Sequence, residues 1–152
     1  MIRPMLFAAA LAATTLPALA VETSPGHTAK TNYILRCVGC HGVDGHGLTE
    51  VGIPDFVNLI GTFARDEAGR AYLANVPNVV GSGLNEDDVA AVLNFIVETW
   101  AGTSLPEDYR SFYGAEVAYL HALEVGNIVD YRRLVAARLA EQGIESAEYP
   151  WP

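Results

Sequence analysis

Two cysteines three positions apart constrain this 152-residue chain more than any other feature. They lie in the segment Cys37-Val38-Gly39-Cys40-His41, and the chain contains no others. On a helical turn, residues at positions i, i+3 and i+4 share one face, so both thiols and the imidazole of His41 would point at the same object. Two cysteines also exclude a scaffold held together by several disulfides.

Four chemistries use cysteines at this spacing: covalent haem attachment, a thioredoxin-like redox site, a zinc site and a local disulfide. Zinc needs a further pair of ligands at regular spacing, which His27, His46 and His121 do not provide. A thioredoxin-like site belongs in a βαβ context, whereas the pattern around Cys37 is helical. The histidine that follows the cysteines favours haem c, with each thiol forming a thioether and neutral His41 coordinating the iron.

The N-terminus predicts export. Arg3 gives a positive start, residues 5–20 are mostly apolar, and Ala18-Leu19-Ala20 is typical of a cleavage site. We therefore expect a signal peptide over residues 1–20 and a periplasmic mature chain. An uncleaved anchor is disfavoured because this stretch is shorter than the roughly 20 apolar residues that span a bilayer, and no later segment is long and apolar enough.

The charge balance indicates which partners to expect. The chain has 9 basic and 18 acidic side chains and a formal net charge of -9. An acidic surface repels phosphate backbones, so nucleic-acid binding is not expected. The same surface would suit a redox partner protein with a basic docking patch.

Helical patterns dominate the sequence and predict an all-α fold. The clearest helix spans residues 86–100, where Asn85 is the expected N-cap and three carboxylates occupy the first turn. Its apolar stripe is expected to pack on a short helix over residues 28–36, whose core-facing residues would be Tyr33, Ile34 and Leu35. Residues 66–75 form a further predicted helix, and the Gly-rich segments 42–60 and 76–84 are predicted loops.

A boundary is expected at residues 102–106. It would separate a haem-binding domain, residues 21–102, from a C-terminal extension, residues 103–152, packed on the core or on a partner. The extension contains two predicted amphipathic helices, 115–125 and 128–142. In the second, the residues expected to be buried are Val129, Leu134, Val135 and Leu139, and those expected to be exposed are Arg132, Arg133 and Arg138.

The stretch from Thr28 to Trp100 resembles the class I cytochromes c. The resemblance rests on CVGCH followed by GVDGHG, then Pro54 with Asn58-Leu59 and Gly61, and the helix NEDDVAAVLNFIVETW. It implies a cytochrome c-like helical domain around one covalent haem. It further implies that the Pro54 carbonyl accepts the hydrogen bond of the ligand histidine, which would fix the ring of His41 and strengthen it as a donor. The implied cofactor-binding residues are Cys37, Cys40, His41 and Pro54.

The chain departs from this family at the second axial ligand, which is usually a methionine. Met1 and Met5 lie in the predicted signal peptide, and the family's methionine would fall at Val76 or Val79, neither of which can ligate iron. Without a thioether ligand we expect a lower redox potential than that of a His/Met cytochrome. The distal position stays open between no ligand, water, Asn78, His46 and His121.

These features favour an electron carrier over an enzyme. The carrier would be a subunit or partner of an exported oxidoreductase, such as a periplasmic dehydrogenase or oxidase. The alternative is a haem-based binding or sensing protein with an open distal site, which the missing methionine motivates. A peroxidase-like enzyme is the third interpretation, and His121 is its one candidate acid-base residue.

Overall fold

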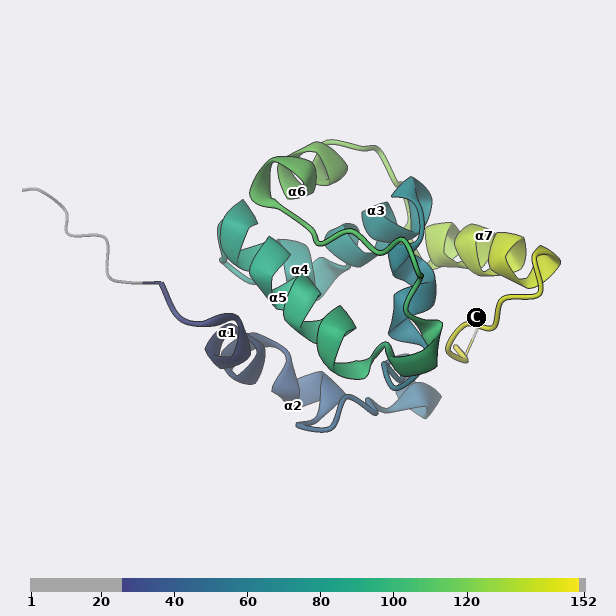
Figure 1. The fold of residues 1–152 in the computed structure, drawn as a ribbon, viewed down its shortest axis with the longest axis horizontal. Helices are drawn as coiled ribbons and strands as arrows, with labels where there is room; N and C mark the ends of the chain where they lie inside the picture. The colour runs from purple at the N-terminus through teal and green to yellow at the C-terminus, as the bar shows by residue number, and fades with distance from the viewer. Residues whose placement is uncertain (1–25, 151–152) are drawn as a thin grey trace, which may run out of the picture.

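A computed structural model describes residues 26–150. Over this range the chain forms seven α-helices joined by short 3-10 turns, with no β-strand (Figure 1). The predicted all-α fold is therefore confirmed for this part of the chain. None of its helices is both long and apolar enough to cross a membrane. The predicted signal peptide, residues 1–20, lies outside the described residues.

The first half of the chain contains short elements that follow one another closely. Thr28 caps the first helix by accepting the N–H of Thr31, and Asp66 caps a later one by accepting that of Gly69. The predicted loop 76–84 includes one helical turn that begins at Pro77, a residue favoured at a first helical position. The elements are α1 (Ala29–Arg36), α2 (Val38–His41), η1 (Thr49–Val51), η2 (Ile60–Ala64), α3 (Glu67–Asn75) and α4 (Pro77–Val80).

Helix α5 (Glu86–Trp100) is the central element of the fold. The side chain of Asn85 accepts the N–H of Asp88, so the predicted N-cap is confirmed. Helix α5 packs against α1, as the sequence predicted, and also against η2. Its buried face carries Val89, Ala90, Val92, Leu93, Ile96 and Val97.

Only part of the predicted apolar face of α1 is buried. Tyr33 lies in the core, with its ring centroid 4.9 Å from that of Trp100. Ile34 and Leu35 are 53% and 58% exposed, so their predicted burial was wrong. Three consecutive residues project in different directions from a helix, and α1 contacts the core along one side.

The C-terminal segment packs directly on this core. It contains η3 (Gly102–Ser104), α6 (Gly114–His121) and α7 (Ile128–Glu141). Helix α6 lies against α5 and α3, and α7 lies against α3 (Figure 1). Apolar residues of both helices belong to the same hydrophobic cluster as α5: Val117, Leu120, Val135 and Leu139.

The buried face of α7 differs from the predicted one. Leu134 is 70% exposed, whereas Arg132 is only 2% exposed, so the predicted burial of Leu134 and the predicted exposure of Arg132 were both wrong. The residues that face the core are Arg132, Val135 and Leu139, which recur at helical spacing. A prediction from apolar character alone therefore gave the wrong orientation for this helix.

The turn η3 lies at the predicted boundary. Hydrogen bonds join this turn and the end of α5 to residues 58–61. The backbone N–H of Asn58 donates to the Trp100 carbonyl at 2.8 Å, and its side-chain oxygen accepts the N–H of Thr103 at 3.3 Å. The Gly61 N–H donates to the Ser104 hydroxyl at 2.9 Å. A side chain at Gly61 would collide with the Ser104 carbonyl, so the two segments approach as closely as backbone allows.

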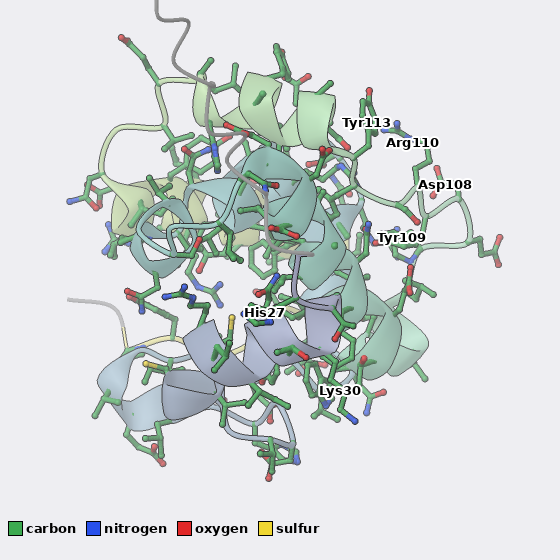
Figure 2. The ribbon with its side chains drawn as sticks, turned by 90° about the vertical axis from the view of Figure 1, so that its left-hand side faces the viewer. His27, Lys30, Asp108, Tyr109, Arg110 and Tyr113 are labelled. Atoms are coloured by element: carbon green, nitrogen blue, oxygen red, sulfur yellow. The ribbon has the colours of Figure 1, made fainter. Side chains whose placement is uncertain are left out.

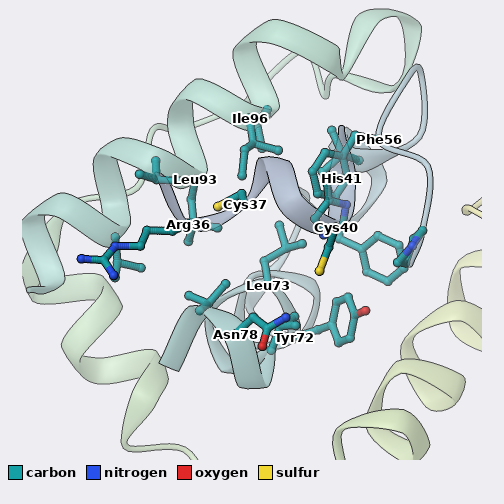
Figure 3. A pocket seen from close by; sticks show the side chains of 18 of the residues that line it. Arg36, Cys37, Cys40, His41, Phe56, Tyr72, Leu73, Asn78, Leu93 and Ile96 are labelled. Carbon is teal, nitrogen blue, oxygen red and sulfur yellow. The ribbon is translucent and has the colours of Figure 1, made fainter. Parts of the chain in front are cut away.

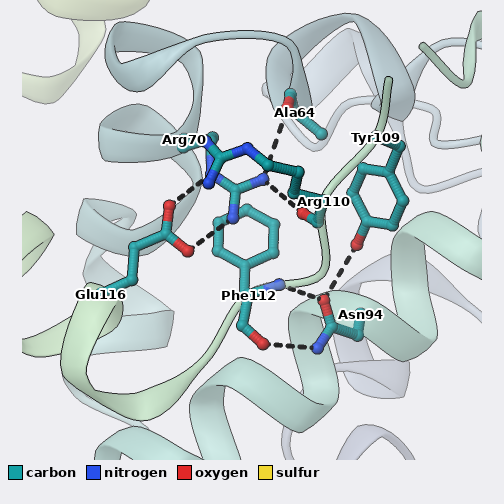
Figure 4. A network of polar contacts seen from close by, with 7 residues as sticks. All are labelled: Ala64, Arg70, Asn94, Tyr109, Arg110, Phe112 and Glu116. Carbon is teal, nitrogen blue, oxygen red and sulfur yellow. Dashed lines mark hydrogen bonds and ion pairs between the residues drawn. The ribbon is translucent and has the colours of Figure 1, made fainter. Parts of the chain in front are cut away.

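The segment between η3 and α6, residues 105–113, is called the strap below. Some of its side chains are exposed, and others hold it on the core. Asp108, Arg110 and Tyr113 lie on the outside of the molecule (Figure 2). Tyr109 instead donates its hydroxyl to Asn94 of α5 at 2.9 Å. The same Asn94 amide accepts the N–H of Phe112 at 2.7 Å and donates to the Phe112 carbonyl at 2.9 Å, so one side chain holds the strap at three points (Figure 4).

Replacing Asn94 with alanine is expected to lower the free energy of unfolding by about 2 kcal/mol, because it leaves partly buried polar groups of Tyr109 and Phe112 without partners. Chemical denaturation of the purified chain would measure the change. Thr99→Ala, at an exposed position of the same helix, is the matched control and should change the free energy by less than about 0.5 kcal/mol. Equal effects of the two substitutions would contradict the anchoring role of Asn94.

Candidate cofactor site

The cysteine motif forms a tight helical corner between α1 and α2. The backbone N–H of Cys37 donates to the Tyr33 carbonyl, ending α1, and the Cys37 carbonyl accepts the N–H groups of Cys40 and His41 at 3.1 and 2.9 Å. The hydroxyl of Tyr33 donates to the Gly42 carbonyl at 2.7 Å, which fixes the end of α2. The predicted arrangement on one helical face is therefore present.

The three motif side chains border one cavity (Figure 3). Both cysteines are free thiols, with Cys37 partly buried and Cys40 exposed. Burial, together with the neighbouring Cys40, raises the pKa of the Cys37 thiol. At neutral pH the Cys37 sulfur therefore carries its proton.

The ring of His41 is partly buried and packs on an aromatic neighbour. Its ring stacks on Phe56, with centroids 4.0 Å apart and planes inclined by 18°. Burial lowers the pKa of His41 to about 4, so the imidazole is uncharged at pH 7 and retains a nitrogen lone pair.

The predicted bond from His41 to Pro54 is only partly formed. The Pro54 carbonyl is the neighbouring acceptor and offsets some of the decrease in the pKa of His41. Its geometry nevertheless falls short of a well-formed hydrogen bond, and Nδ1 is a buried polar atom without a partner. Pro54 lines the same cavity as the motif, so all four predicted cofactor-binding residues border it.

The cavity is large and mostly apolar. Its empty space is about 1050 Å³, a volume that includes open solvent at the mouth. Tyr72, Leu73 and Asn78 lie across from the cysteines (Figure 3). The remaining apolar walls come mainly from η2, α4 and α5: Ile60, Phe63, Val79, Val89, Val92, Leu93, Ile96 and Val97.

The loop that follows the motif packs closely on the last residue of α5. Gly45 has a positive φ of 82° and is buried against Trp100. A side chain there would meet the indole ring at 2.8 Å. Only glycine combines this backbone conformation with such close packing, which explains a Gly-rich sequence at this point.

The residues considered for the distal side of the iron fall into two groups, those that line the cavity and those that do not. Val76, Val79 and Asn78 all line the cavity. His121 does not, since its Nε2 lies 3.1 Å from the Ala74 carbonyl outside the lining. His46 is exposed and paired with a carboxylate, Asp55, at 2.8 Å, and it too lies outside the lining. The structure thus gives no support to ligation by either histidine.

Two alternatives for the cysteines lack supporting residues. Within residues 26–150, no group of three or more His, Cys, Asp and Glu side chains is arranged as a metal site, so a zinc ion at Cys37 and Cys40 would have too few ligands from this part of the chain. His27, the remaining histidine, is exposed at the start of α1 (Figure 2). The described fold also lacks the strands of a thioredoxin-like βαβ unit.

No known protein family and no curated protein matches the chain. The interpretation of the cavity therefore depends on the residues that line it. One of them, Arg132, was predicted to be exposed and was missed as a site residue. Its spacing from Val135 and Leu139 on α7 is the sequence signal that could have placed it inside.

Proposed function

We propose that this chain is a c-type cytochrome that binds one haem covalently through Cys37 and Cys40, with His41 as the proximal iron ligand. It would carry single electrons in the periplasm for an exported oxidoreductase. The observation that best supports this function is the convergence of two thiols and a neutral imidazole on one large apolar cavity. The sequence resemblance to class I cytochromes c agrees with it.

The residues present fit a covalently bound haem. Each thiol can add across a vinyl double bond, with the sulfur bonding to one carbon and the thiol proton passing to the other, so attachment consumes no oxidant. Cys37 and Cys40 are both free for this reaction. Haem would supply one-electron redox chemistry at its iron.

The protein's own contribution is to orient and shield the cofactor. Phe56 stacks on the His41 ring and the Pro54 carbonyl lies beside it, and both would set its orientation. Leu73, Leu93 and Ile96 give the cavity apolar walls, which would exclude water around a bound group. Such exclusion would protect bound iron from side reactions.

Electron exchange needs one edge of the cofactor near the surface, and the exposed residues of and beside the motif would allow this. Cys40 is exposed, and Val43 beyond it is 79% exposed. Small contact areas are typical of transient redox partners. This is why we favour an electron carrier.

A haem-based protein that binds a small ligand is the second candidate. It is favoured by one observation, the presence of Val76 and Val79 in the cavity wall where the related cytochromes place a methionine. Neither valine can occupy the sixth position of iron. The amide of Asn78, in the same wall, is the polar group nearest in sequence.

Expression of the full chain in a bacterial host with a working c-type maturation system tests the proposal. We expect one covalent haem per chain, measured by mass and by the spectrum of the denatured haem, and a redox potential below that of His/Met cytochromes. Absence of covalent haem would refute the proposed function. Six-coordinate spectra that carbon monoxide leaves unchanged would support the carrier, whereas rapid binding of carbon monoxide would support the second candidate.

A further inference from the structure

A buried arginine from the C-terminal extension lies in the wall of the cavity. Arg132 is 2% exposed and borders the cavity together with Phe63 and Tyr72. Its guanidinium lies 4.8 Å from the ring centroid of Phe63, 5.2 Å from that of Tyr72 and 5.0 Å from that of Tyr149. Three aromatic rings therefore surround this cation.

Within residues 26–150, the hydrogen bonds of Arg132 leave its charge without a counterion. Its guanidinium donates to the Tyr72 hydroxyl at 3.1 Å and to the Ala147 carbonyl at 2.8 Å, and both acceptors are neutral. Its Nε is buried and has no hydrogen-bond partner. Among the ion pairs found within residues 26–150, none involves Arg132.

The other buried arginine of this fold shows the contrast. Arg70 is also 2% exposed, but two of its nitrogens donate to the Glu116 carboxylate at 2.6 Å. An arginine keeps its charge at any accessible pH, and a buried charge without a counterion is costly. Glu116 is the counterion of Arg70, whereas Arg132 borders a cavity that can accommodate an anion.

We propose that Arg132 is the buried anion-binding residue of this cavity and pairs with a carboxylate of the bound group. Given the proposed function, on which this inference rests, that carboxylate is a haem propionate. Tyr72, which also lines the cavity, would assist. Burial raises its pKa, so the phenol keeps a proton that it can donate to the same carboxylate.

This assignment gives the C-terminal extension a direct role in cofactor binding. Arg132 and Ala147 both border the cavity, and both belong to residues 103–152. The haem site would therefore be completed by a segment outside the stretch that resembles class I cytochromes c. That segment fixes Arg132 through the carbonyl of Ala147 and the ring of Tyr149.

The test uses the full chain with Cys37→Ala and Cys40→Ala, which prevents covalent attachment and keeps His41. Zinc protoporphyrin IX and its dimethyl ester serve as probes, because they differ only in whether the carboxylates are free. We expect the free acid to bind at least about tenfold more tightly than the diester. Adding Arg132→Gln should remove this preference.

Two further variants complete the design. Arg132→Met, whose unbranched apolar chain fills the same space, carries the same expectation if the glutamine variant does not fold. Arg133→Gln removes a neighbouring exposed arginine of α7 and should leave the preference unchanged.

Each outcome has a defined meaning. An unchanged preference in the Arg132 variants, or no binding of either porphyrin, would overturn the role of Arg132. Covalent haem in the matured native chain would in that case still support the proposed function. Failure of the native chain to acquire haem would instead refute that function.

Discussion

Replacement of both Cys37 and Cys40 with alanine is expected to abolish covalent haem attachment completely. Each thiol would supply one thioether under the proposed function, so either single variant should retain haem through the other sulfur. Both cysteines border the cavity, and neither is in a disulfide, so the fold should survive their loss. Haem that stays with the chain after denaturation and organic extraction is the quantity to measure.

Val38→Ala is the matched control, because this residue lies between the cysteines and has no sulfur. It should retain full attachment. Circular dichroism would establish that the double variant is folded before its haem content is interpreted. Haem that resists extraction from the folded double variant would show that attachment does not occur through these thiols.

Replacement of Arg70 with leucine is expected to lower the free energy of unfolding by about 3–5 kcal/mol. The guanidinium pairs with Glu116 on α6, donates to the Arg110 carbonyl at 2.9 Å and lies 3.6 Å from the centroid of the Phe112 ring (Figure 4). Its removal leaves the Glu116 carboxylate, only 12% exposed, without a cation. Urea denaturation of the purified chain would measure the loss.

A second ion pair of this fold provides the control. Arg138 pairs with Asp66 at 2.7 Å, but both side chains are at least 40% exposed. Arg138→Leu should therefore cost no more than about 1 kcal/mol. The double variant Arg70→Met with Glu116→Leu should recover most of the stability, because it removes both buried charges. A loss at Arg70 as small as that at Arg138 would contradict the importance of the buried pair.

The features that could be predicted from the sequence are local ones. The cap at Asn85 involves a hydrogen bond to a residue three positions away, and the i, i+3, i+4 spacing of Cys37, Cys40 and His41 is a property of one helical turn. Such features depend little on the rest of the chain. The all-α fold and the shared orientation of the three motif side chains follow from them.

The features that could not be predicted depend on distant contacts. Arg132 meets Tyr72 across 60 positions of sequence, and Arg70 meets Glu116 across 46. Composition gives no indication of such partners, so an arginine was assigned to solvent and Leu134 to the core. The positions of His46 and His121 outside the cavity likewise depend on how distant elements pack, which no local pattern encodes.

The tightly bound turn η3 has a consequence for cooperativity. Its hydrogen bonds to Asn58 and Gly61 join the C-terminal extension to the segment that runs from Pro54 into η2. Loss of contacts in the extension should therefore be transmitted to the cavity wall without an intervening flexible linker. We expect the residues before and after this turn to unfold in one transition, so that a destabilising substitution in the extension would also weaken ligand binding in the cavity.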